Sequence, residues 1–136
     1  MAICLVQPQS PDGWRQARSL IEQYAASLGV DLSFQNFGHE LENLAGDYAP
    51  PAGAFLLAQE EGAYLGCVGL RQYAAGVGEM KRLYITPAAR GMRVGRLLAE
   101  GIVGLARQRG YSRLLLDTLP FMKEAQSLYA TRVSSH

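Results

Sequence analysis

The sequence EMKRLYITPAARGMRVGRLL (residues 79–98) decides the fold of this chain. Its first part, Glu79 to Ile85, predicts a β-strand that ends at Thr86-Pro87. A loop follows from Ala88 to Arg93, and a helix is expected to begin at about Val94. A strand that turns sharply into a helix leaves backbone N–H groups unpaired, and the helix dipole adds partial positive charge there. The stretch therefore predicts a binding site for an anion such as a pyrophosphate.

Two common phosphate-binding motifs do not match this turn. A P-loop ends in Gly-Lys-Ser/Thr, whereas this chain has Val94-Gly95-Arg96. A dinucleotide-binding turn needs GxGxxG after an early strand of a parallel unit, whereas Gly91-Met92-Arg93 follows antiparallel strands. A structural alternative stays open, in which Gly91 and Gly95 only permit a tight loop.

The elements on either side of the turn predict a mixed sheet. Three strands with short connections, Ala54–Gln59, Tyr64–Tyr73 and Glu79–Ile85, predict an antiparallel meander. The helix that follows ends at Gly110, and Arg113–Asp117 contains three consecutive leucines, which is typical of a strand buried on both faces. The strand–helix–strand unit predicts that its two strands are parallel.

The remaining segments complete the predicted order β α α β β β α β α. A strand is expected at Ile3–Val6, followed by an amphipathic helix from Ser10-Pro11 to Leu28. A short helix that contains Phe37, Leu41 and Leu44 is expected to end at Gly46. A final helix is expected at Phe121–Arg132. Residues 1–136 are therefore expected to form one α/β domain, with helices on both faces of a mixed sheet.

Composition excludes several classes of function. The net charge is +1, with 13 basic and 12 acidic residues, so no global field favours nucleic acid or an anionic membrane. The chain lacks a basic leader and an apolar run of membrane-spanning length, so a cytoplasmic protein is expected. Cys4 and Cys67 lie in apolar strand-like runs and are expected to be buried free thiols rather than a disulfide or a metal pair.

The pattern strand-Thr-Pro-x-x-Arg-Gly-x-x-x-Gly-x-x-Leu-Leu resembles the acetyl-CoA motif of the GNAT superfamily of N-acetyltransferases. That motif is usually written Gln/Arg-x-x-Gly-x-Gly/Ala. Arg90 occupies its first position and Gly95 its last, whereas Arg93 replaces the middle glycine. The order of elements from Ile3 to Tyr129 also matches the family, so the resemblance covers nearly the whole chain.

The resemblance implies a GNAT-like fold with acetyl-CoA as co-substrate. The pantetheine arm would lie in a gap beside Arg113–Asp117 and pair with the backbone of Leu83, Tyr84 and Ile85, as an added strand would. The pyrophosphate would be bound by the turn and the start of the helix, namely by Arg90, Gly91, Met92, Arg93, Val94, Gly95 and Arg96.

The resemblance also implies candidate catalytic residues. Glu79 occupies the position where several family members have a general base, which acts directly or through water. It is expected to share a strand face with Leu83 and Ile85. The structural alternative is an ion pair with Lys81 or Arg82.

Tyr129 is the candidate general acid for the departing thiolate. The run Ala125-Gln126-Ser127-Leu128-Tyr129 resembles the family segment Asn-x-x-Ala-x-x-Leu-Tyr, with Met122 in place of the asparagine. The alternative is a tyrosine of the core. Arg71, Tyr48 and Tyr73 are candidates for lining the acceptor pocket.

The resemblance implies two further strands after Tyr129, and the tail from Ala130 to His136 resembles neither, so the chain is expected to be a shortened family member. An exposed edge is then expected beside Arg113–Asp117. A truncated gene product whose edge a homodimer covers is the favoured explanation, and a compact natural variant or strand exchange with a partner chain are the alternatives. The expected function is transfer of an acetyl group from acetyl-CoA to a primary amine of a small molecule or peptide, by direct attack in a ternary complex. A non-catalytic acyl-CoA-binding or interaction module is the alternative.

Overall fold

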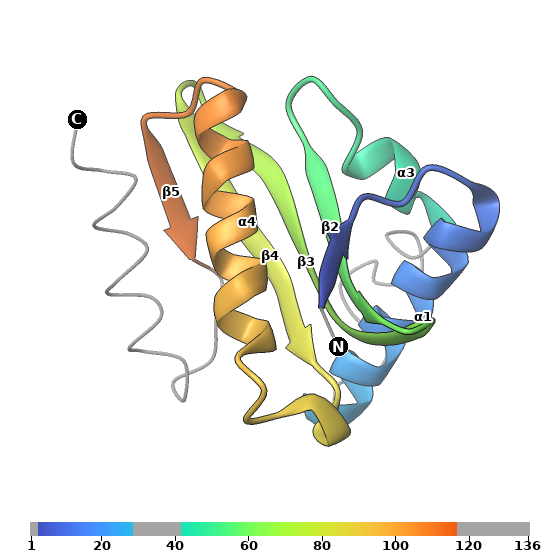
Figure 1. Cartoon of the computed structure of the whole chain (residues 1–136). Coiled ribbons are helices and arrows are strands. Elements are labelled where there is room, and N and C mark those ends of the chain that lie inside the picture. Colours follow the sequence, from blue (N-terminus) through green and yellow to red (C-terminus); the bar gives the residue numbers. More distant parts are fainter. Residues whose placement is uncertain (1–2, 29–41, 117–136) are drawn as a thin grey trace.

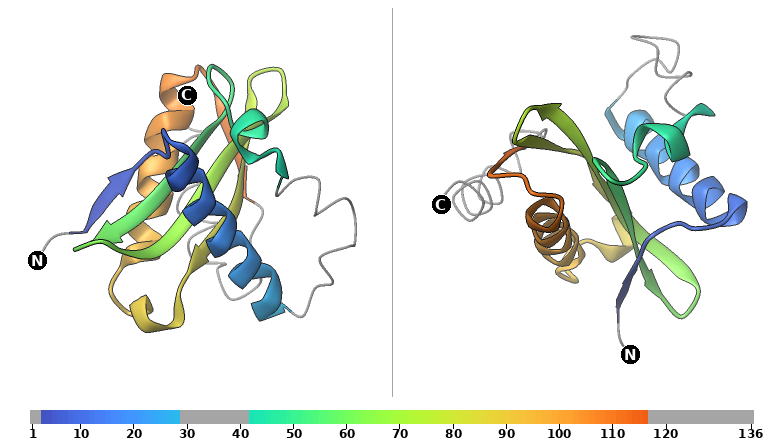
Figure 2. Two further views of the ribbon diagram at one scale, coloured as in Figure 1. Left: turned by 90° about the vertical axis from the view of Figure 1, so that its right-hand side faces the viewer. Right: turned by 90° about the horizontal axis from the view of Figure 1, so that it is seen from above.

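A five-stranded mixed sheet forms the centre of the molecule (Figure 1). The computed structural model describes residues 3–28 and 42–116. The elements are β1 (Cys4–Val6), α1 (Pro11–Leu28), α3 (Leu44–Asp47), β2 (Ala54–Glu60), β3 (Ala63–Ala74), β4 (Val77–Ile85), the 3₁₀ turn η2 (Pro87–Ala89), α4 (Val94–Gln108) and β5 (Arg113–Leu116). Helix α1 covers one face of the sheet and α4 the other, as the view from above shows (Figure 2).

The strand order β1-β2-β3-β4-β5 confirms the predicted topology. Strands β1 to β4 are antiparallel neighbours, and β5 pairs with β4 in parallel, as expected for the two ends of a crossover through α4. The β2–β3 turn consists of Glu61 and Gly62, whose φ angles of 50° and 85° suit a tight two-residue hairpin. The β3–β4 turn is shorter than predicted, because β3 extends to Ala74 and β4 begins at Val77.

Helix α1 begins and packs as its sequence predicts. The hydroxyl Oγ of Ser10 accepts a hydrogen bond of 3.1 Å from the backbone N–H of Gly13, which is the expected N-cap. Its buried residues Ala17, Ile21 and Ala25 recur at helical spacing and face the sheet. Burial of this stripe fixes α1 against the sheet.

Each face of the sheet has its own apolar core. On the α4 face, residues of the sheet pack against the helix, and the core includes Leu56, Val68, Leu70, Met80, Leu83, Leu98 and Ile102. On the α1 face, the core includes Ala17, Ile21, Leu44, Tyr48, Phe55, Leu57, Cys67 and Tyr84. Because side chains alternate along a strand, membership in one core or the other shows which way each strand residue points.

Two predictions on the N-terminal half are wrong. The second helix does not end at Gly46, since α3 runs to Asp47 and the N–H of Tyr48 still bonds to the carbonyl of Leu44 at 3.0 Å. Burial of Tyr48 against Phe55 holds this end of α3. Cys4 is exposed, because β1 is a short edge strand with one neighbour, whereas Cys67 is buried as expected.

Several predicted features lie outside the described residues. They are the helix positions Phe37 and Leu41, the strand residue Asp117 and the final helix Phe121–Arg132. Within the described residues, β5 is the last strand of the sheet, next to the edge that a homodimer is expected to cover. Of the three leucines in β5, Leu114 is buried and Leu115 is half-buried. Within residues 3–28 and 42–116, no helix combines the length and hydropathy needed to cross a membrane. The same residues contain no group of three or more His, Cys, Asp or Glu side chains placed to hold a metal ion.

Candidate active site

Strand β4 contains a bulge at Arg82. Lys81 pairs with Gly69 of β3, and Tyr84 pairs with Cys67, so two β4 residues stand opposite the single residue between them. Arg82 has the left-handed backbone conformation, with φ 61°. The extra residue bends the strand and shifts its side-chain alternation by one.

The bulge separates Glu79 from the residues that follow it. Met80 and Leu83 both lie in the α4 core, although an unbroken strand would place them on opposite faces. Glu79 alternates with Met80 and therefore points to the α1 face. The prediction that Glu79 shares a face with Leu83 and Ile85 is wrong, because the left-handed residue at position 82 inverts the pattern.

Glu79 has a cationic neighbour on its own strand. Its Oε1 lies 3.9 Å from Nζ of Lys81, and the two side chains are 25% and 19% exposed, respectively. The ion pair that the structural alternative anticipates is therefore present. A partly exposed ion pair of this length contributes at most about 1 kcal/mol to stability. Stabilisation by Lys81 therefore does not by itself explain why position 79 is a glutamate.

The thiol of Cys67 lies against the bulge from the neighbouring strand. It donates a weak hydrogen bond of 3.4 Å to the carbonyl of Arg82. Burial raises the pKa of the Cys67 thiol far above its ordinary value of 9.0, and the charge of Arg82 and a backbone bond from Tyr84 offset this in part. Cys67 is thus a neutral, packed side chain that supports the bulge, and it lacks the thiolate character of a nucleophile.

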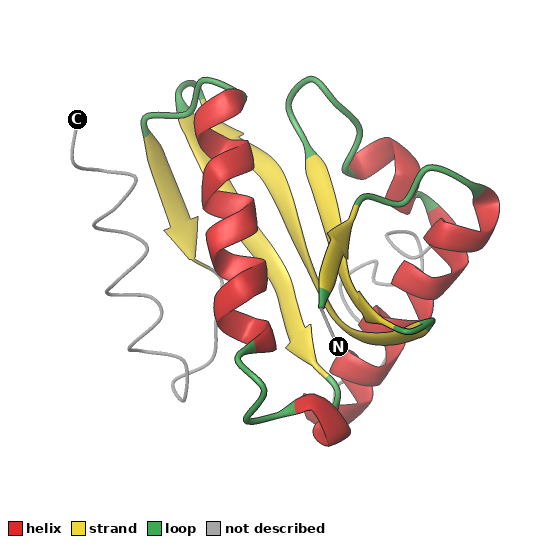
Figure 3. Cartoon of the chain, in the orientation of Figure 1, coloured by secondary structure: helices red, strands yellow, loops and turns green. Residues whose placement is uncertain are grey.

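The turn into α4 lies at the end of β4 (Figure 3). After η2, Arg90 is extended and Gly91 has φ 90°. Arg93, directly before the helix, has φ 64° and ψ 18° and makes no side-chain capping bond. Val94 and Gly95 belong to the first helical turn, where backbone N–H groups have no acceptor within the helix. The turn thus presents N–H groups and exposed guanidinium groups at one end of the sheet.

Arg93 adopts a left-handed conformation, which glycine adopts without strain. The left-handed region costs a non-glycine residue about 1–2 kcal/mol. The arginine therefore occupies a backbone position that favours glycine, and it adds a charge at the start of α4. Gly95 permits a close contact between α4 and β4, because a Cβ there would lie 3.1 Å from Cδ1 of Ile85.

We expect the variants Arg93→Gly and Arg93→Ala to separate the roles of backbone and charge. Both remove the guanidinium, so each should raise the Kd for acetyl-CoA by about 5–10-fold if this group contacts phosphate. The glycine variant alone should relieve the left-handed strain, so it should be more stable than the alanine variant by about 0.5–1 kcal/mol. Calorimetric titration and urea unfolding measure the two effects. Equal stability of the variants would contradict the backbone argument, and unchanged Kd values would contradict the phosphate contact.

The predicted site residues do not all meet at one point. Leu83 to Ile85 and the turn from Arg90 to Arg96 are continuous in space, since β4 leads through η2 directly into α4. Glu79 lies before the bulge and on the opposite face, and Tyr129 lies outside the described residues. Arg96 also bonds Glu100 through Nε, at 3.4 Å from Oε2. The described part of β5 pairs with β4 only from Val77 to Met80, upstream of the bulge.

The bulge itself is a feature that the sequence prediction missed. The available signal was Lys81-Arg82, two successive charged residues in a strand whose other positions are mainly apolar. Such a pair interrupts the alternation that a regular half-buried strand requires.

The α1 face carries further polar and aromatic groups. The guanidinium of Arg71 lies over the ring of Tyr48, 5.8 Å from its centroid. Tyr48 contacts Phe55 edge-on, and Phe55 contacts Trp14. Tyr73, the third candidate for the acceptor pocket, is exposed.

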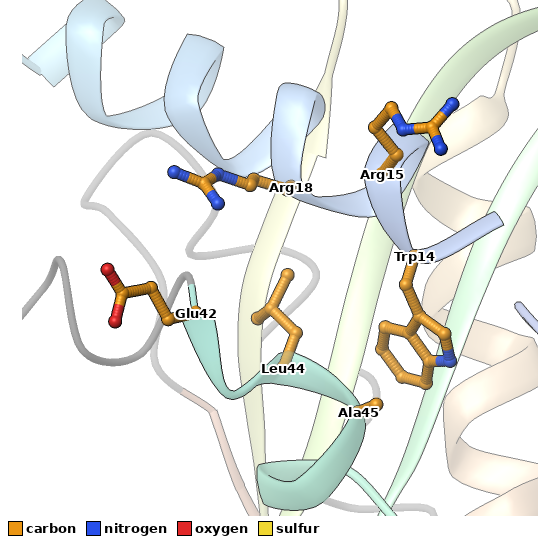
Figure 4. A pocket seen from close by; sticks show the side chains of 6 residues that line it. All are labelled: Trp14, Arg15, Arg18, Glu42, Leu44 and Ala45. Carbon is orange, nitrogen blue, oxygen red and sulfur yellow. The ribbon is translucent and has the colours of Figure 1, made fainter. Parts of the chain in front are cut away.

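An open hollow of about 240 Å³ lies between α1 and α3 (Figure 4). Trp14, Leu44 and Ala45 form its apolar wall. Arg18 and Glu42 extend toward its other end, whereas Arg15 points away from it. Arg15 and Arg18 both form ion pairs within α1. Arg15 lies 2.9 Å from Asp12, and Arg18 lies 3.7 Å from Glu22.

This mixed sheet, in which the bulged strand β4 leads through a turn into α4, is the fold of solved acetyltransferases. The family model described as "Acetyltransferase (GNAT) family" matches residues 16–132. The chain belongs to this family, and it is an N-acetyltransferase by family.

Similar proteins agree with this assignment. An uncharacterized N-acetyltransferase of Schizosaccharomyces pombe is 40% identical over 124 residues, which cover 90% of this chain and 74% of the relative. A GNAT family acetyltransferase from Staphylococcus aureus has a TM-score of 0.76 at 19% identity, over 96% of this chain and 81% of that chain. An aminoglycoside 6'-N-acetyltransferase whose structure was solved with coenzyme A has a TM-score of 0.64 at 18% identity, over 85% of this chain and 61% of that chain. These two structures show the shared fold.

Proposed function

We propose that this chain transfers the acetyl group of acetyl-CoA to a primary amine of a small molecule or peptide, by direct attack within a ternary complex. The bulge at Arg82 carries the proposal. Glu79, before the bulge, points to the α1 face, whereas Leu83, beyond it, lies in the α4 core on the part of the strand that leads to the turn before α4. An amine that approaches from the α1 face would meet Glu79, while the acetyl donor would occupy the strand beyond the bulge.

The residues beyond the bulge fit coenzyme A in their chemistry. The backbone of Leu83, Tyr84 and Ile85 would pair with the amide groups of the pantetheine arm. The N–H groups at the start of α4 and the guanidinium groups of Arg90 and Arg93 would bind the pyrophosphate. The backbone is left-handed at Gly91 and Arg93, and Arg93, the N-cap residue of α4, makes no side-chain capping bond to the helix.

The reaction requires two proton transfers, one from the attacking amine and one to the departing thiolate. The amine nitrogen attacks the thioester carbonyl, and Glu79 accepts the proton that the nitrogen loses, directly or through a water. The N–H of Leu83, next to the bulge, would stabilise the negative charge on the carbonyl oxygen. The carbon–sulfur bond then breaks, and Tyr129 would supply the proton to the thiolate.

Acetyl-CoA binding and amine-dependent thiol release test this function together. Binding at 100 times the Kd should stabilise the folded chain by about 2.7 kcal/mol, which is on the order of a 10 °C rise in Tm. A thiol reagent should then record coenzyme A release that requires an added amine. If acetyl-CoA binds but no amine in a broad panel stimulates the release of coenzyme A, the non-catalytic acyl-CoA-binding module is favoured. Absence of a thermal shift would overturn both readings.

A further inference from the structure

Arg71 stands directly opposite Glu79 in the sheet. The two residues are register partners in the antiparallel pair β3–β4. Leu70 lies in the α4 core, so Arg71, its neighbour, points to the α1 face, where Glu79 also points. Side chains at directly opposite positions start about 4.5–5.5 Å apart at their Cβ atoms. A group bound by Arg71 is therefore close to one bound by Glu79.

In the described residues, Arg71 and Glu79 interact with different neighbours rather than with each other. The carboxylate of Glu79 lies near Lys81, at 3.9 Å, and the guanidinium of Arg71 lies over Tyr48. Within the described residues, that ring is the recorded partner of the Arg71 guanidinium, which has five N–H donors. An aromatic face attracts the cation and fixes its position, but it accepts no in-plane N–H bond.

This arrangement leaves a positioned guanidinium group beside the proposed base. Arg71 is half-buried, and its planar edge is suited to two parallel hydrogen bonds from a carboxylate. The local charge also favours an anion, because Arg71 and Lys81 are cationic and Glu79 is the anionic member of this group.

We propose that Arg71 binds a carboxylate of the acceptor, so that the acceptor is an amino acid or another amine with a carboxylate a few bonds from its nitrogen. The inference rests on the proposed function, since it specifies the substrate of the same site. In this arrangement, Arg71 holds the carboxylate while the amino group faces Glu79. Tyr48 is a positioning residue that holds the guanidinium.

Matched acceptor pairs test the proposal. Each pair consists of an amino acid and the amine that lacks only its carboxylate, such as serine and ethanolamine, or phenylalanine and phenethylamine. The wild-type chain should prefer the amino acids. In Arg71→Gln, kcat/KM for the preferred amino acid should fall about 10–100-fold, mainly through KM, because a charge-assisted pair contributes about 1.5–3 kcal/mol. The kcat/KM of Arg71→Gln for the decarboxylated amine should change less than about threefold. Arg71→Lys should recover part of the lost kcat/KM for the amino acid.

Two controls separate binding from folding. Arg15→Gln removes an exposed arginine of α1 and should leave kcat/KM unchanged for both the amino acid and the decarboxylated amine. The thermal shift with acetyl-CoA should be the same in wild type and Arg71→Gln, which shows an intact fold and donor site.

The outcomes distinguish this proposal from the proposed function. If the wild type acetylates amines but shows no preference for the carboxylate, or if Arg71→Gln slows both members of a pair equally, the Arg71 proposal is overturned and the transferase function stands. The same holds if amines that carry a phosphate are preferred to amino acids. If no amine is acetylated, the proposed function fails, and the substrate assignment fails with it.

Discussion

Replacement of Glu79 by glutamine is expected to lower kcat by a factor of about 10²–10⁴, the range that general acid–base catalysis commonly contributes. Glutamine has nearly the same shape but cannot accept the amine proton. Binding of acetyl-CoA should be nearly unchanged, since Glu79 lies on the α1 face and before the bulge. Steady-state kinetics with a saturating amine and calorimetric titration with acetyl-CoA measure the two quantities.

A matched carboxylate provides the control for this substitution. Glu61 lies in the β2–β3 turn, on the surface, so Glu61→Gln should leave kcat unaffected. Loss of the Glu79–Lys81 pair should cost at most about 1 kcal/mol in unfolding free energy. A decrease in kcat of less than tenfold would show that Glu79 acts as the structural partner of Lys81 rather than as the base.

The substitution Gly66→Ala is expected to destabilise the fold by about 2–4 kcal/mol, at the upper end of the cost of overpacking. Gly66 of β3 lies beside the last residues of β4, and a Cβ there would lie 2.5 Å from the carbonyl oxygen of Tyr84 and 3.1 Å from Cδ1 of Leu98. The first of these atoms belongs to the backbone and cannot move without displacing β4. The variant should therefore also weaken acetyl-CoA binding, because Leu83 to Ile85 are the proposed contacts of the pantetheine arm.

Gly104→Ala is the contrasting glycine variant. Gly104 lies within α4, and a Cβ added there would meet no atom within 4 Å. Alanine should stabilise the helix by about 0.5–1 kcal/mol, since glycine loses more conformational entropy on folding. Urea unfolding of both variants gives the comparison. Equal stabilities would show that β4 adjusts freely beside Gly66, which would remove the argument for a rigid strand end.

Local sequence patterns were sufficient for most of the fold. Helical periodicity and short strand connections act over a few residues, so the predicted amphipathic helix α1, the start of α4 and the antiparallel meander are confirmed. The parallel pairing of β5 with β4 follows from the same reasoning, because a helical crossover permits little else. The turn before α4 also lies where its proline and glycines place it.

The arrangement of the proposed site depended on contacts between distant segments. The left-handed conformation of Arg82 arises where β4 pairs with β3 around the bulge, and no propensity of arginine favours it. The bulge moves Leu83 and Ile85 to the face opposite Glu79, whereas Glu79 and Arg71 share the α1 face because they are register partners before the bulge. Cys4 is exposed for a similar reason, because its strand lies at the sheet edge.

The sequence by itself thus determined the family, the order of the described elements and the position of the turn before α4, because each of these follows from short-range periodicity and from residues with special backbone geometry. Only the tertiary structure decided which side chains share a face with Glu79. That choice depends on strand register, and a shift of one residue moves every later side chain to the opposite face of the sheet.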